Sequence, residues 1–213
     1  MRNILILTMI ILINFKVFGQ TLPNIVGAYS NGKNYMLTKS FRTQVKESQL
    51  PSIRNIGQEN QKIQYFDGLG RLSQTVDVML SPAFKDVVQH IEYDTYGREA
   101  IKYLPYVGSN QNGEFKPGGA SNVTTFYSKT SGTDINGIVR TNKPFSVAIF
   151  ENSPLDRIIQ KGSPGQAWQP AASRSSTGRT VVTVYGANDS SKRKDFKMAG
   201  KQHQHGSDFR ILW

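Results

Sequence analysis

YFDGLGR at residues 65–71 and EYDTYGR at residues 92–98 share one pattern, aromatic-Asp-x-x-Gly-Arg, and the two copies lie 27 residues apart. A match at a fixed spacing is typical of a repeat architecture. Each copy reads as a hairpin, in which the aromatic residue ends an incoming strand and the Asp side chain accepts the backbone N–H bonds that close a turn. The Gly supplies the positive φ of a turn that ends in a bulge, and the Arg opens the outgoing strand.

The predicted turn motif comprises Asp67, Gly70, Arg71, Asp94, Gly97 and Arg98. The guanidinium of each Arg should reach the Asp of its own turn or lie on a neighbouring aromatic ring. Each Asp is accompanied by the Gly that explains the turn, so we interpret both carboxylates as structural and not as catalytic.

Alternation of apolar and polar side chains surrounds the two turns and predicts strands. The segments with this pattern are residues 34–45, 62–66, 72–78, 87–93, 101–104, 145–150 and 180–185. Residues 46–60 read as a loop. Residues 107–142 are rich in Gly, Asn, Ser and Thr, and predict a long surface excursion with one short extended piece at 123–127. We find no helix pattern after residue 20, so we predict an all-β fold of antiparallel hairpins with long Gly/Asn/Ser-rich loops.

Residues 1–19 read as a secretory signal peptide, with Arg2 followed by an apolar stretch at 4–13 and small residues before Gln20. A membrane anchor is the alternative, but a spanning helix needs roughly 20 apolar residues. We therefore predict an exported protein, secreted or at the outer cell surface, with no stable membrane span after cleavage. Residues 20–33 then form a short lead-in to the folded part.

The net charge and the cysteine content limit the kinds of crosslink, metal site and partner that the protein can have. The chain has 213 residues, a formal net charge of +11 and no Cys, which excludes disulfides and Cys-ligated zinc. A basic balance permits binding to acidic polymers, but the charge is scattered apart from the run at 192–194. Residues 190–213 lack strand alternation, so we interpret them as a disordered or out-of-frame tail and predict no nucleic-acid partner.

The sequence contains no pattern typical of a catalytic, metal or cofactor site. His203 and His205 have a metal-like spacing but no third ligand nearby. Phosphate-binding loops and nucleophile elbows are both absent from the sequence, and we interpret His90 as an exposed strand histidine outside any triad. Glu92 and Asp94 share a strand face, which leaves a small secreted hydrolase as a third hypothesis. We predict a protein that is not an enzyme and needs no cofactor.

The repeated motif resembles the YD repeats of the Rhs family, in which Tyr–Asp hairpins stack into a long spiralling β-sheet. Further residues follow the order of one module found in that group of proteins: Asn34-Tyr35 with Thr38, residues 64–71, residues 90–94 with Gly97-Arg98, residues 103–106, residues 150–157, and residues 162–165 with Trp168. Residues 34–189 are similar to the N-terminal module of large Rhs-type surface proteins of Bacteroidetes, a domain of unknown function named DUF6443.

The resemblance implies a fold of YD-repeat hairpins and a structural or interaction role at the start of an exported protein. Full-length relatives form β-shells that present a variable C-terminal cargo or toxin. Two clear motif copies cannot close a shell, so we interpret the chain as truncated and expect the missing downstream YD repeats as its partner. The alternative is a cell-surface carbohydrate-binding or adhesive module, in which exposed Tyr103, Tyr106 and Trp168 would stack on surface glycans.

Overall fold

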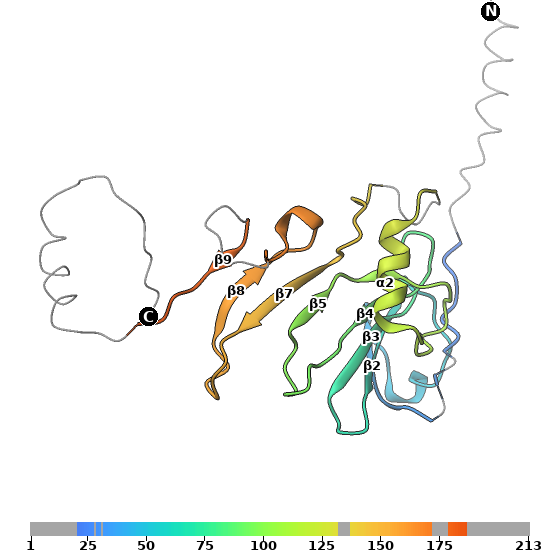
Figure 1. Ribbon diagram of the computed structural model, residues 1–213. Coiled ribbons are helices and arrows are strands. Elements are labelled where there is room, and N and C mark those ends of the chain that lie inside the picture. The colour runs from blue at the N-terminus through green and yellow to red at the C-terminus, as the bar shows by residue number, and fades with distance from the viewer. Residues whose placement is uncertain (1–20, 28, 31, 132–136, 172–178, 187–213) are drawn as a thin grey trace, which may run out of the picture.

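The computed structural model describes residues 21–186, apart from residues 28, 31, 132–136 and 172–178. The predicted signal peptide and the predicted basic tail lie outside the described residues, as do His203 and His205. The described part of the chain forms two antiparallel sheets and one α-helix of 10 residues (Figure 1). No described helix is long and apolar enough to cross a membrane.

The first sheet has the strand order β1-β2-β3-β4-β6. Its strands are β1 (Asn34–Phe41), β2 (Glu59–Phe66), β3 (Leu72–Asp77), β4 (Val87–His90) and β6 (Tyr106–Val107). The alternation along β2 is strict, because Ile63 and Tyr65 are fully buried while Gln64 between them is not. Alternate residues of a strand point to opposite faces, so this pattern places one face of the sheet in a core.

The second sheet has the strand order β5-β7-β8-β9. Its strands are β5 (Ile101–Tyr103), β7 (Phe145–Phe150), β8 (Ile158–Gly162) and β9 (Val181–Val182). An isolated antiparallel bridge between Ile91 and Lys102 connects the continuation of β4 to β5. The two sheets therefore meet at this bridge, near the end of the strands that carries the hairpin turns. Strand β6 turns back into the first sheet and pairs with β4.

The helix α2 (Gly119–Ser128) shows that one prediction was wrong. Residues 123–127 were expected to be extended, yet they lie inside this helix. Val123, Phe126 and Tyr127 are its buried residues, and their three- and four-residue spacing places them on one helical face against β4 and β6. The surrounding Ser, Asn and Thr are weak helix formers, which hid the helical period from a sequence reading.

Smaller differences concern the lengths of the predicted strands. The strand expected over 34–45 ends at Phe41, and the loop expected over 46–60 contains the 3-10 helix η1 (Glu47–Gln49) and already enters β2 at Glu59. Only two residues of the segment 180–185 form a ladder as β9, although the Thr183 N–H also donates to the Ile159 carbonyl at 3.0 Å. A mostly antiparallel β fold is confirmed.

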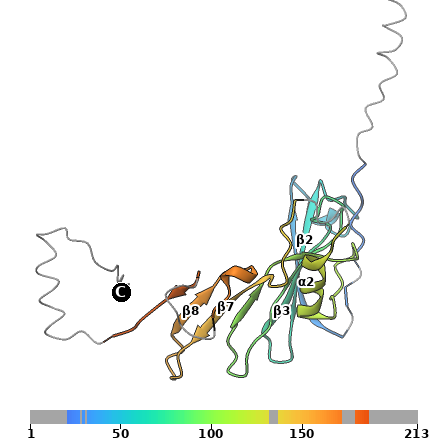
Figure 2. The same cartoon turned by 45° about the horizontal axis from the view of Figure 1, so that its top comes forward.

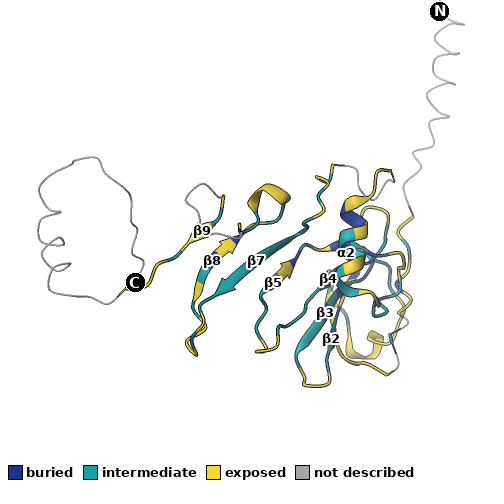
Figure 3. Ribbon diagram, in the orientation of Figure 1, coloured by how far each residue is buried: buried dark blue, intermediate teal, exposed yellow. Residues whose placement is uncertain are grey.

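Burial divides the molecule unevenly (Figure 3). The core cluster is drawn from the first sheet, α2, nearby loops and, from the second sheet, Tyr103 alone: Ile25, Ile63, Tyr65, Val76, Val78, Met79, Val88, Tyr103, Tyr106, Val123, Phe126 and Tyr127. Every residue of β7 is half-buried, and both residues of β9 are exposed. An open groove of about 620 Å³ lies over β7, lined in part by Phe145, Val147 and Ile149.

Candidate interaction site

The turns after β2 and after the continuation of β4 have the same geometry. Asp67 Oδ1 accepts hydrogen bonds from the backbone N–H groups of Leu69 at 2.9 Å and Arg71 at 2.8 Å. Asp67 Oδ2 accepts from Arg71 Nε at 2.8 Å. Gly70 has a φ of 77°, a conformation that side chains with a Cβ rarely adopt.

The second turn repeats these contacts. Asp94 Oδ1 accepts from the backbone N–H groups of Tyr96 and Arg98, and Oδ2 accepts from Arg98 Nε, each at 2.9 Å. Gly97 also has a φ of 77°. The structure thus gives each Asp of the sequence motif a turn-closing role and brings it together with its own Arg.

A third turn of related design joins β7 to β8, and sequence reasoning missed it. Glu151 takes the place of the Asp and binds the Arg157 guanidinium through both carboxylate oxygens, at 2.6 Å from Nε and 2.7 Å from Nη2. Asp156, with a φ of 50°, stands where the other turns have Gly. The loop is longer and the acid is Glu, so the aromatic-Asp-x-x-Gly-Arg pattern did not match. The sequence Phe150-Glu151 followed by Arg157 was the available signal.

Two of the arginines connect their own turn to the aromatic residue that comes next in the fold. The centre of the Arg71 guanidinium lies 4.4 Å from the Tyr93 ring centroid, and that of Arg98 lies 4.2 Å from the Phe150 centroid. Tyr93 and Phe150 each directly precede the carboxylate of the following turn. Stacking of a guanidinium on an aromatic face is attractive, so the turns form a linked row. We call this row the turn ladder.

Two further contacts strengthen the turn ladder. The Tyr93 hydroxyl donates to the Leu72 carbonyl at 3.0 Å, which fastens the second turn to the start of β3. Arg98 Nη1 lies 2.6 Å from Asp156 Oδ1, which fastens the second turn to the third. The three turns lie side by side at one end of the strands, at the bottom of the view in Figure 2.

Hydrogen bonding holds the turn carboxylates in their charged form. The backbone N–H of the following Arg, aided by its guanidinium, lowers the pKa of Asp67 and of Asp94. The Arg157 guanidinium lowers the pKa of Glu151 in the same way. Groups with lowered pKa values that already have partners are suited to fixing structure and poorly suited to taking up a proton in catalysis.

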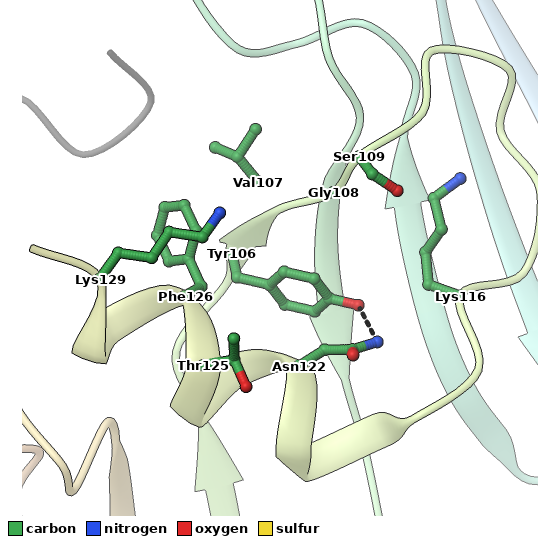
Figure 4. Close-up of a pocket in the computed structure, with 9 residues that line it drawn as sticks. All are labelled: Tyr106, Val107, Gly108, Ser109, Lys116, Asn122, Thr125, Phe126 and Lys129. Atoms are coloured by element: carbon green, nitrogen blue, oxygen red, sulfur yellow. Dashed lines mark hydrogen bonds between the residues drawn. The ribbon is translucent and has the colours of Figure 1, made fainter. Parts of the chain in front are cut away.

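A small cavity of about 170 Å³ lies between α2 and β6 (Figure 4). Its lining includes Ser109, Lys116 and Lys129 but no acidic residue and no His. Asn122 Nδ2 donates to the Tyr106 hydroxyl at 3.3 Å inside it. A metal ion needs convergent acidic, His or Cys ligands, which the lining of this cavity does not have. In the rest of the described chain too, no three His, Asp or Glu residues gather as metal ligands.

Two buried carboxylates were not expected from the sequence, and both have partners. Asp86 is fully buried and lies 2.9 Å from the Lys116 ammonium, and it also accepts the backbone N–H groups of Met79 and Gly113. Glu59 is 2% exposed and pairs with Lys39 and Arg54. Removing one partner would leave the other charge buried and unpaired, so these pairs fix the loop paths around the first sheet.

His90 and two tyrosines differ from their predicted exposure. The His90 side chain is only 16% exposed, because its ring packs 5.3 Å from the Tyr103 ring. Tyr103 and Tyr106 are buried, with exposed fractions of 8% and 5%. Neither ring is therefore exposed for the glycan stacking that was expected of both. Tyr103 donates to Glu92 at 2.6 Å, and burial together with that bond raises its pKa. Trp168 remains exposed at 45%.

Comparison with known proteins gives one finding. Residues 37–182 match the family described as a domain of unknown function, DUF6443. Neither the curated proteins nor the solved structures gave a significant match.

Proposed function

The chain belongs to the family of that domain of unknown function, DUF6443, and we propose that it is a non-enzymatic structural and interaction module. In this proposal it forms the N-terminal part of an exported Rhs-type protein of Bacteroidetes, and further hairpins of YD-repeat type continue its second sheet. The similarity of its turn residues to YD repeats and the signal-like residues 1–19 support the assignment.

The observation that carries the proposal is the open edge at β9. This strand pairs with β8 through Val182 opposite Gln160 and Val181 opposite Lys161, and no described strand pairs with its other side. Val181 and Val184 are 68% and 69% exposed. Residues 180–186 carry no charge. An uncharged, β-branched edge is well suited to accept another strand and is costly to leave bare.

The turn ladder supports continuation past this edge. The Arg157 guanidinium lies 4.4 Å from the Tyr185 ring centroid, and the Tyr185 hydroxyl donates to the Ile158 carbonyl at 3.2 Å. Tyr93 makes the same two contacts, with Arg71 and with Leu72. Tyr185 therefore stands in the position that precedes a turn in the earlier units, which makes residues 181–185 the incoming strand of a fourth hairpin in our proposal.

An experiment on the full chain tests the role of the edge. We expect the purified protein to aggregate as its concentration rises, because β9 pairs with any available strand. Replacing Val182 and Val184 by Lys should suppress this aggregation, since charge on an edge strand opposes pairing. The near-ultraviolet circular dichroism of the protein should stay unchanged, because the packed aromatic residues of the first sheet are not affected. Val139→Lys, at an exposed loop position, is the matched control and should not suppress it.

Two outcomes would contradict the proposal. A parent protein that stays monomeric at high concentration and melts in one cooperative step at high temperature would show that β9 needs no further strand. Aggregation that persists in the Lys variants would show that another surface is responsible.

A further inference from the structure

Of the ion pairs between described residues, the pair of Asp86 and Lys116 is the most deeply buried. The two side chains are 0% and 7% exposed, and Lys116 Nζ lies 2.9 Å from Asp86 Oδ2. Taking two opposite charges out of water can cost more free energy than their mutual attraction returns. A reaction that removes both charges would therefore be favoured at this place in the fold.

The surroundings of Lys116 hold its amine in one place. The Lys116 backbone N–H donates to Gln74 Oε1 at 2.8 Å, and Gln74 Nε2 donates to the Lys116 carbonyl at 3.0 Å. Gln74 itself is fully buried on β3. The lysine stem also packs against Gly108, where an added Cβ would lie 3.2 Å from Lys116 Cε. The amine is thus directed at one carboxyl group.

Two backbone N–H groups polarise the Asp86 carboxyl group. The Met79 N–H donates to Oδ1 at 3.1 Å, and the Gly113 N–H donates to Oδ2 at 2.9 Å. A nitrogen in hydrogen-bond contact with a carboxyl oxygen is about 3–4 Å from the carboxyl carbon, close to the separation of a near-attack arrangement. Fixed N–H groups at such an oxygen stabilise the negative charge that develops there during nucleophilic attack.

We propose that Asp86 and Lys116 react with each other and form an intramolecular amide bond. Proton transfer within the buried pair gives a neutral amine and a carboxylic acid. Lys116 Nζ then attacks Asp86 Cγ, and the new Nζ–Cγ bond forms. Oδ2 takes the second proton from the nitrogen and leaves as water, while Oδ1 remains as the amide oxygen and keeps its bond to the Met79 N–H. One ammonium and one carboxylate become one amide and one water, with no oxidant or reductant.

The water that is released has a route to solvent. Lys116 lines the open cavity of about 170 Å³ between α2 and β6 (Figure 4). The amide itself stays where the two side chains are buried, so it is protected from hydrolysis by bulk water.

The amide closes residues 86–116 into a covalent loop. This loop contains β4, β5, β6 and the second turn of the turn ladder. The chain has no Cys and therefore no disulfide, so the amide supplies a covalent restraint of its own. A cross-link of this kind stabilises a fold mainly by restricting the unfolded chain. The bond does not depend on the continuation of the second sheet.

Mass spectrometry of tryptic peptides from the folded full chain tests the bond. Trypsin does not cleave between Lys116 and Pro117, so without the bond Lys116 lies in peptide 103–129 and Asp86 in peptide 86–98. We expect one branched peptide that joins the two and whose mass is lower than their sum by about 18 Da, the mass of one water. Fragmentation of this peptide should place the branch at the two named side chains.

Two controls separate this reaction from other losses of water. The exposed pair of Lys62 and Asp77 has its nitrogen and oxygen 3.3 Å apart, and Lys62 should stay free and be cleaved by trypsin. In Lys116→Arg the positive charge remains, but the guanidinium keeps its proton and does not act as a nucleophile. This variant should have the full mass of its sequence and should give the two peptides separately.

Two results would overturn the proposal. The first is a parent protein that shows the near-ultraviolet circular dichroism of packed aromatic residues and still gives peptides 86–98 and 103–129 separately, at full mass. The second is an equal loss of water in Lys116→Arg, which would assign the loss to another part of the chain.

Discussion

The two sheets of this protein are ordered by different means. The first sheet has a core, in which Ile63, Tyr65 and Val88 are fully buried and α2 covers one face. The second sheet has a half-buried central strand, an exposed last strand and an open groove over β7. The turn ladder, which starts at the β2–β3 turn of the first sheet, connects the hairpins of the second sheet to it through carboxylate–arginine and arginine–aromatic contacts.

The difference teaches how a sheet can be prepared for extension. Apolar burial stabilises a sheet independently of any later strand, at about 25 cal/mol for each Å² removed from water. Contacts that pass from each turn to the next hairpin fix the position of the adjoining unit instead. In a chain that combines both kinds of contact, the sheet with the buried core is stable by itself. The stability of the other sheet depends on a strand that pairs with its open edge.

Core truncation should produce the largest contrast between the sheets. Ile63 is fully buried on β2, so Ile63→Ala should cost about 2–5 kcal/mol through lost burial and an unfilled cavity. Ile149→Ala makes the same change at a half-buried site on β7 and should cost clearly less, because water already reaches the side chain. Denaturant unfolding of both variants measures the difference, and equal losses would break the contrast.

A glycine exchange in the turn ladder should have a smaller effect on the free energy of unfolding. Gly97 has a φ of 77°, and an added Cβ would make only ordinary contact, 3.6 Å from Arg71 Nη1. The cost of Gly97→Ala is therefore the backbone penalty, about 1–2 kcal/mol. Gly68→Ala, in the first turn, has no positive φ and open space around it, and should be close to neutral. Similar losses at both positions would contradict the turn geometry.

Removing one arginine–aromatic contact should loosen the link without unfolding it. Phe150→Leu keeps an apolar side chain but removes the ring that lies 4.2 Å from the Arg98 guanidinium. Hydrogen exchange of β7 amides should become several-fold faster, while β2 amides stay unchanged. In an Arg98→Lys background the same substitution should add less, because Lys lacks the planar group that stacks. Additive effects would show that the contact does not couple the turns.

Acidification should have the smallest of these effects on stability, because it removes only the contribution of the turn carboxylates. The turn carboxylates have lowered pKa values in the folded protein, so their contribution is fully present above the ordinary carboxyl pKa of about 4 and is lost as the pH falls through the lowered values. Asp94→Asn should therefore be less stable than the parent at pH 7, and the difference should shrink below about pH 4. Melting temperatures across this range test it, and a constant difference would exclude the charge as the cause.

The sequence predicted the strands and both Asp turns because their signals are local. Alternation along β2 and the Asp–Gly–Arg spacing each depend on residues within one hairpin. It did not predict the Asp86–Lys116 pair or the burial of Tyr103, which depend on residues brought together from distant parts of the chain. The helix α2 was not predicted because Ser, Asn and Thr interrupt its apolar pattern. The Glu151 turn was not predicted because its loop is longer than the loops of the other two turns.

Native-state hydrogen exchange tests the central contrast most directly. Measured on the full chain at low denaturant concentrations, it gives the opening free energy of each strand separately. We predict that amides of β7 and β8 exchange through an opening that costs much less than the opening that exposes β2, so that the second sheet opens while the first stays closed. Equal protection and one shared dependence on denaturant would show a single cooperative unit and contradict this account.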